Sequence, residues 1–188
     1  MKRLVALVLL VAVAAAAMSA EVTDWALMKG RLHFSAPVGW IELPRQTRET
    51  SDIVAFQIPN PADEGTSDSA NVAVTANWSL AERSIERFSE GPLRSLREMP
   101  GTIVVNDVTS ADGSRTVLSR GQQGSTPYLV IDTFGFGGGT HVWCRAAYPL
   151  LEGTSEKWNA SVVRDYNTLV ASITVDGKAV FPKPEASK

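Results

Sequence analysis

The sequence predicts an α+β protein in which antiparallel strands predominate, and two observations carry this prediction. Between residues 31 and 148, short apolar or alternating runs recur and are separated by turn residues, which is typical of strands. Two other segments repeat their apolar residues at every third or fourth position, which is typical of amphipathic helices. The chain should therefore fold as a sheet that packs against a small number of helices.

The strand prediction follows the chain in order. The predicted strands are residues 31–36, 39–43, 52–58, 71–78, 102–109, 115–122, 128–136 and 140–148. The turns among the later strands are marked by Asp112-Gly113 and by the run Gly137 to Gly139. This spacing predicts an antiparallel meander in the second half of the chain.

Helical periodicity marks residues 154–173 and residues 79–99. The first segment has one apolar stripe, which predicts that the helix docks on the sheet through Trp158, Val162, Leu169 and Ile173. The second should begin at a capping serine, Ser79, and should break or kink at Gly91-Pro92, because proline removes a backbone donor.

The segment "FSAPVGW" ends the first strand. Pro37 cannot donate to a sheet ladder, and Gly39 permits backbone angles that other residues avoid, so this pair should turn the chain. Trp40 then follows as a large apolar side chain, which we interpret as a core residue, with a ligand-stacking role as the alternative.

The first twenty residues are predicted to be a secretory signal peptide. Lys2 and Arg3 precede an unbroken apolar run from Leu4 to Ala17, and small residues follow it. The run is short for a membrane span, which needs about 20 apolar residues, so we expect no membrane anchor after cleavage. The expected organisation is a signal peptide (1–20), a lead-in (21–30), a single domain (31–176) and a flexible C-terminal tail (177–188).

Composition restricts the partners. Without the signal peptide the chain has 16 basic and 20 acidic residues, a net charge of −4, and neither sign forms a long run. This argues against nucleic acid or an anionic membrane as the main partner. Cys144 is the only cysteine, so no intrachain disulfide can form, and we interpret it as a small buried hydrophobe. We expect a periplasmic or secreted protein.

The order of these elements resembles the PsbP-like superfamily. The residues that carry the resemblance are the opening "FSAPVGW", a helix after the first strands, a long antiparallel meander and a closing amphipathic helix, over roughly residues 31 to 175. The superfamily includes a photosystem II extrinsic subunit, a Ran-binding nuclear import factor and many small exported bacterial proteins. The resemblance implies an α/β/α sandwich, in which an antiparallel sheet is flanked by helices, and a noncatalytic role in binding other proteins.

Catalytic motifs are mostly absent. The chain has no G-x-S-x-G, no H-E-x-x-H and no Walker loop, and its two histidines exclude a multi-histidine metal site. We therefore expect no cofactor and no metal. The segment "GFGGGTH" between two predicted strands is interpreted as a hairpin turn. A turn of four residues there would place Asp132 opposite His141, where the carboxylate could orient the imidazole as a general base.

Three function classes stay open. The leading one is an exported, noncatalytic envelope protein that binds a protein or peptide as an adaptor, assembly factor or immunity protein. The alternatives are a small hydrolase that uses His141 and Asp132, and a small-ligand carrier with a pocket lined by aromatic residues (Trp40, Trp78, Trp143 and Trp158). Strand alternation places His141, Trp143 and Arg145 on one face, and the candidate binding residues are these three together with Asp132 and Trp40.

Overall fold

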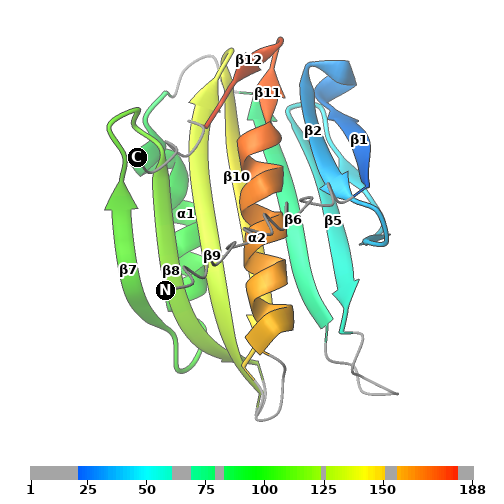
Figure 1. Ribbon diagram of the computed structural model, residues 1–188. Helices are drawn as coiled ribbons and strands as arrows, with labels where there is room; N and C mark the ends of the chain where they lie inside the picture. The colour runs from blue at the N-terminus through cyan, green and yellow to red at the C-terminus, as the bar shows by residue number, and fades with distance from the viewer. Residues whose placement is uncertain (1–20, 61–68, 79–82, 124–125, 151–155, 182–188) are drawn as a thin grey trace, which may run out of the picture.

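The computed structural model describes residues 21–60, 69–78, 83–123, 126–150 and 156–181. These residues form one large and one small antiparallel sheet, with two α-helices (Figure 1). The predicted signal peptide (1–20) and the predicted helix cap Ser79 lie outside the described residues. Within the described part of the chain, no helix has both the length and the apolar character needed to cross a membrane.

The large sheet contains every strand predicted after residue 39. Its order is β3 (Ile41–Glu42), β5 (Ser51–Pro59), β6 (Ser69–Trp78), β10 (Thr140–Pro149), β9 (Thr126–Gly137), β8 (Arg115–Gln123) and β7 (Ile103–Thr109), and β4 (Gln46–Thr47) also pairs with β5. Strands β7 to β10 pair consecutively and antiparallel, so the predicted meander is confirmed.

The small sheet joins the two ends of the described chain. Its order is β1 (Val22–Leu27), β2 (Leu32–Pro37), β11 (Thr174–Val175) and β12 (Lys178–Ala179), and the short 3-10 helix η1 (Met28–Gly30) connects its first two strands. β1 falls in the segment predicted to be a lead-in, and its residues are mostly exposed. Of the C-terminal residues assigned to the tail, Val180 and Phe181 are buried.

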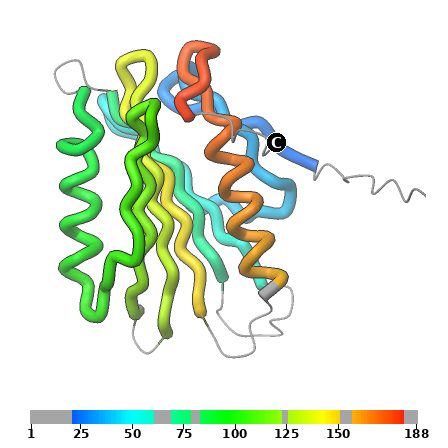
Figure 2. Tube along the Cα trace, turned by 60° about the vertical axis from the view of Figure 1, so that its left-hand side comes forward, coloured from blue at the N-terminus to red at the C-terminus, as the bar shows by residue number. Residues whose placement is uncertain are grey.

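The predicted α/β/α sandwich is wrong, although the mixed α+β class stands. Helix α1 (Ile85–Arg97) lies on one face of the large sheet and helix α2 (Glu156–Ser172) on the other (Figure 2). The described part of the chain thus has one helix per face, and the small sheet shares its face with α2, where strand β2 contacts that helix. Strands rather than helical layers therefore dominate the molecule.

The two faces of the large sheet carry separate apolar clusters. The α2 face holds the larger cluster, in which Trp158, Val162 and Leu169 of α2 and Ile173 directly after it are buried, so the predicted docking stripe is confirmed. The α1 face holds a smaller cluster of Ile85, Leu93, Leu96, Val117, Val130 and Phe134. The α1 face of the sheet is therefore less completely covered by apolar packing than the α2 face.

Helix α1 differs from its prediction in two respects. It begins after Ser84, whose hydroxyl accepts a hydrogen bond from the Arg87 amide at 3.2 Å. It also continues through Pro92 instead of breaking there. Ile85 before the proline and Leu93 after it are both buried against the same sheet face, and their burial offsets the lost backbone hydrogen bond.

The turn at the start of the domain follows the prediction. Strand β2 ends at Pro37, and Gly39 has a φ of 95°, in the left-handed region that favours glycine. The Trp40 ring lies 5.7 Å from the ring of Phe56 and is half-buried against the larger cluster. Trp40 therefore packs against the core, as the core interpretation expects.

Candidate functional site

The hairpin of β9 and β10 fixes the position of the predicted site residues. Gly138 and Gly139 form a two-residue turn with φ values of 56° and 74°, as a tight hairpin requires. The hairpin interpretation of the glycine run is therefore confirmed. This turn is centred two residues later than the four-residue turn from Gly135 to Gly138 that the dyad needed, so Asp132 lies opposite Arg145, and His141 lies opposite Phe136. The general-base arrangement of Asp132 and His141 is not formed.

His141 shares a face with Trp143 and Arg145 but is not on the surface. Helix α1 covers it, and its side chain is 1% exposed. The imidazole stacks on Phe88 with ring centroids 4.5 Å apart and contacts Phe136 at 4.8 Å. A ring held between two phenylalanines is part of the packing between α1 and the sheet, so it is not accessible to a substrate.

Asp132 organises the residues that do reach the surface. Its side chain is fully buried, and Oδ1 accepts hydrogen bonds of 2.7 Å from both Trp143 Nε1 and Arg145 Nε. Oδ2 accepts a third bond, of 3.0 Å, from Arg145 Nη2. A buried carboxylate is stable only when it is paired and hydrogen-bonded, and these three bonds meet that condition.

Trp143 and Arg145 form a rigid pair above this carboxylate. The guanidinium carbon lies 4.8 Å from the centroid of the indole ring, and the indole stacks on Phe134 at 6.1 Å and 12°. Both side chains are half-buried, with 27% of the Arg145 side chain exposed. Because each is held from below, little conformational entropy would be lost when a partner covered them.

Strand pairing extends this pair into a wider surface. Two rows of residues cross from β10 through β6 to β5. One row is Arg145, Ala73 and Ala55, and the other is Trp143, Thr75 and Ile53. We call these six residues the open face, because α1 lies behind β8 and β9 and no described helix lies over this side of β5 and β6 (Figure 1). Thr75 is buried and the other five residues are half-buried, and the side chains are small or apolar except for the Arg145 head group.

A small pocket adjoins the open face at the end of α1. Its volume is about 110 Å³, and its lining includes Arg145 and Ala147 of β10, Val130 of β9, and Leu96 and Met99 at the end of α1. Sequence periodicity could not predict this pocket, because it forms only where the last turn of the helix meets three strands.

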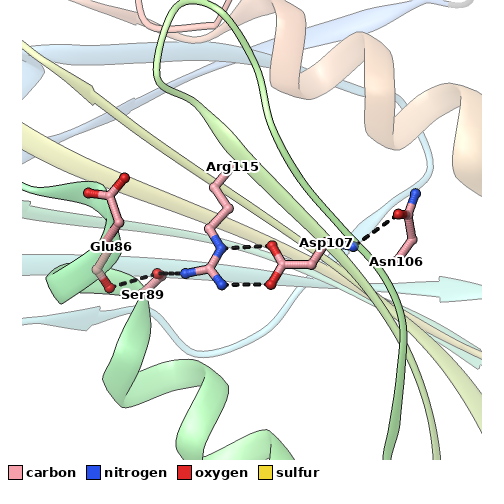
Figure 3. A network of polar contacts seen from close by, with 5 residues as sticks. All are labelled: Glu86, Ser89, Asn106, Asp107 and Arg115. Carbon is pink, nitrogen blue, oxygen red and sulfur yellow. Dashed lines mark hydrogen bonds and ion pairs between the residues drawn. The ribbon is translucent and has the colours of Figure 1, made fainter.

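A second polar network, which the sequence analysis missed, braces the other side of α1 (Figure 3). Arg115 on β8 donates hydrogen bonds of 2.9 and 2.6 Å to the two carboxylate oxygens of Asp107 on β7, and one of 2.8 Å to Ser89 on α1. Ser89 in turn donates to the Glu86 carbonyl oxygen. The hydrogen bond from Arg115 lowers the pKa of Asp107. The network joins β7, β8 and α1 through three N–H groups of Arg115, so we interpret its role as structural.

The remaining chemical candidates are buried or dispersed. Cys144 is fully buried, and this burial raises the pKa of its thiol well above its usual range, which confirms the interpretation of a small buried hydrophobe. The tryptophans proposed for a carrier do not meet: Trp158 is in the cluster under α2, whereas Trp143 packs on the α1 face. Trp78 lies under the Arg31 guanidinium at 4.1 Å. The described residues contain no group of three or more His, Cys, Asp or Glu placed to hold a metal ion.

Comparison with known proteins supports the fold and does not assign a function. No family model and no curated protein matches the chain. The structure is similar to the Saccharomyces cerevisiae Ran-binding protein Mog1p, with 15% sequence identity over 84% of this chain and 97% of that chain and a TM-score of 0.57. A Mog1 point mutant gives 14% identity, coverage of 82% and 96%, and a TM-score of 0.54. LpqN, a protein involved in cell envelope biogenesis of Mycobacterium tuberculosis, gives 11% identity, coverage of 82% and 90%, and a TM-score of 0.49. At these identities the similarity to Mog1 shows a shared fold.

Proposed function

We propose that this chain is a noncatalytic module that binds a protein or peptide through the open face of its large sheet. The observation that carries the proposal is the use of a fully buried carboxylate, Asp132, to hold Trp143 and Arg145 half-exposed on that face. Trp and Arg are the residues most often found at binding hot spots, above all when they are fixed before the partner arrives.

The chemistry of the face fits a macromolecule better than a substrate. The small, half-buried side chains of Ala55 and Ala73 can lie against another polypeptide without steric obstruction. The most enzyme-like arrangement, Asp132 with His141, is not formed. The tryptophans that would line a carrier pocket lie on different faces of the sheet. Both alternatives therefore lose their structural support.

The setting of this function is also proposed. The signal-peptide pattern of residues 1–20 supports export to the periplasm or beyond, where the chain would bind a partner in the cell envelope as an adaptor, assembly factor or immunity protein. The fold shared with Mog1, a Ran-binding protein, supports a binding role and membership of the PsbP-like superfamily.

Site-specific photocrosslinking in the native cells tests the binding function. A photoreactive phenylalanine analogue at Ala55, on the open face but away from the ion pair, should crosslink a defined protein. The matched control places the analogue at the exposed Ala26 of the small sheet, which should not capture that protein. The Ala55→Arg variant places a large charged side chain on the open face and should weaken binding of the crosslinked protein. Ala26→Arg should leave that binding unchanged. Equal capture from both positions, or none from Ala55, would contradict the proposal.

A further inference from the structure

The pocket at the end of α1 has an amphipathic lining. Four apolar residues form its walls (Leu96, Met99, Val130 and Ala147), and polar groups come from Arg145, Thr102, Gln122 and Tyr128. With a volume of about 110 Å³, it has room for about four non-hydrogen atoms, since a water molecule takes about 30 Å³ in the liquid. A leucine side chain has four carbon atoms.

Within the described part of the chain, the Thr102 hydroxyl and Arg145 Nη1 have no hydrogen-bond partner. The Thr102 hydroxyl is buried and has no hydrogen-bond partner. Arg145 binds Asp132 through Nε and Nη2, which leaves the two N–H groups of Nη1 available. A β-carbon at Gly121 would lie 3.1 Å from the Thr102 oxygen, so the glycine keeps the surroundings of this hydroxyl clear.

The electrostatics of the pocket favour a neutral occupant. The charge of Arg145 is already offset by Asp132, at 2.7 Å. Leu96 and Met99 lie at the C-terminal end of α1, where the exposed carbonyl groups give a partial negative charge. An anion would meet this negative end, because the two arginines of the last turn, Arg94 and Arg97, line a separate pocket together with Glu90 and Glu98. A hydrogen-bond acceptor without charge, such as a backbone carbonyl, meets neither penalty.

We propose that this pocket anchors one neutral, leucine-sized apolar side chain of an extended peptide segment, whose backbone carbonyl accepts a hydrogen bond from Arg145 Nη1. The inference rests on the proposed function and names the chemistry of its partner. Because Arg145 belongs both to the open face and to the pocket wall, a segment that crosses the open face reaches the pocket without changing direction.

Titration of the ¹⁵N-labelled protein with blocked amino acids tests the inference. N-acetyl-leucine methylamide carries the side chain and a backbone carbonyl, and it should shift the amide signals of Thr102, Gly121 and Ala147 with a Kd on the order of 1–10 mM, as its size predicts. N-acetyl-glycine methylamide and N-acetyl-aspartate methylamide should bind at least tenfold more weakly. Equal or tighter binding of the aspartate compound would mean that the pocket is an anion site, and the absence of any saturable shift would overturn the proposal.

Two variants locate the binding in the pocket. Ala147→Leu fills the pocket from its strand and should abolish binding of the leucine compound, whereas the matched change Ala55→Leu, on the open face but outside the pocket, should not. Met99→Ala widens the pocket and should allow N-acetyl-phenylalanine methylamide to bind. Thermal unfolding of each variant separates loss of the pocket from loss of the fold. If the wild type does not bind the phenylalanine compound and Met99→Ala also fails to bind it, the assignment of the pocket walls is wrong.

The inference and the proposed function can fail separately. Crosslinking from position 55 together with no binding of the leucine compound would keep the function and reject the pocket. Binding of the leucine compound without crosslinking from position 55 would keep the pocket as a binding site for an isolated apolar group and reject the macromolecular partner on the open face.

Discussion

Arg145 Nε on β10 lies 2.7 Å from Oδ1 of Asp132 on the neighbouring strand, and the carboxylate is fully buried while 27% of the arginine side chain is exposed. The arginine therefore has two roles, because it presents a head group to the surface and also neutralises a charge beneath it. The surface function and the stability of the sheet depend on the same ion pair.

This relationship predicts that Arg145→Ala is destabilising as well as defective in binding. Removal of one partner of a buried pair leaves an uncompensated charge, which costs about 3–5 kcal/mol in the free energy of unfolding. Because Asp132 is fully buried, truncation at this position is not a neutral surface change. Urea unfolding measures the loss.

The double variant Asp132→Leu/Arg145→Leu is the control for that loss. It removes both charges, so it should be closer in stability to the wild type than Arg145→Ala is. The difference from the two single variants gives the coupling energy. If the stability losses of Asp132→Leu and Arg145→Leu added up to the loss in the double variant, the ion pair would contribute nothing to the stability of the fold.

The hairpin that carries this pair shows how far sequence could predict the site. Strand alternation correctly placed His141, Trp143 and Arg145 on one face. The register across the hairpin could not be predicted, because a glycine run permits turns of several lengths and each one-residue change alters the residue that lies opposite Asp132. Alternation also cannot reveal which residues of a face a distant helix covers, so the burial of His141 under α1 was not foreseen.

The elements that the sequence analysis missed have physical reasons of their own. The mostly exposed residues of β1 do not produce a strong strand pattern, and β11 and β12 have only two residues each. Pro92 was expected to break α1, but tertiary burial on both sides of it outweighed the local preference. The long strands and α2 were predictable because each buries a periodic stripe.

Truncation of Leu169 tests the docking of α2. This residue is fully buried within the larger cluster, so Leu169→Ala should lower the free energy of unfolding by about 2–5 kcal/mol. Thr168→Ala, at the neighbouring exposed position, is the matched control and should change stability by less than about 0.5 kcal/mol. Thermal unfolding of Leu169→Ala that coincided with wild type would mean that the helix does not dock through this stripe.

Gly135 permits the close approach of the C-terminal segment to β9. A β-carbon there would lie 2.5 Å from Phe181 Cε1 and 2.8 Å from Val180 Cγ1. Gly135→Ala should therefore displace the buried Phe181 and cost about 1–3 kcal/mol, as overpacking does. In a Phe181→Ala background the same glycine change should cost less, because its main clash has been removed. An equal cost in both backgrounds would place the strain elsewhere.

Tyr166 should make stability fall at alkaline pH. Its hydroxyl donates to the carbonyl oxygen of Cys144 at 3.0 Å and contacts Thr133 Oγ1 at 2.8 Å, and burial raises the pKa of the phenol well above its ordinary value. Above about pH 10 the unfolded chain loses this proton while the folded chain retains it, so the free energy of unfolding decreases as pH rises. Tyr166→Phe should be less stable than wild type at pH 7, by about 1–3 kcal/mol, and should show a shallower alkaline decline. An unchanged alkaline slope would mean that this phenol ionises alike in both states.

The ion pair between Asp107 and Arg115 should affect stability at acid pH. The hydrogen bonds from Arg115 lower the pKa of Asp107 in the folded state, so the pair stabilises the fold above the unfolded carboxyl pKa of about 3.9, and this contribution is lost as pH falls through the folded value. Asp107→Asn should therefore be less stable than wild type at pH 7 and should show a smaller decrease in Tm between pH 4 and pH 2. Ser89→Ala is the matched control, because it removes the third hydrogen bond of Arg115 without altering the pair. Ser89→Ala should lower Tm at every pH but keep the wild-type decrease in Tm between pH 4 and pH 2. If that decrease were as small as in Asp107→Asn, the acid sensitivity would belong to the whole network and not to the carboxylate.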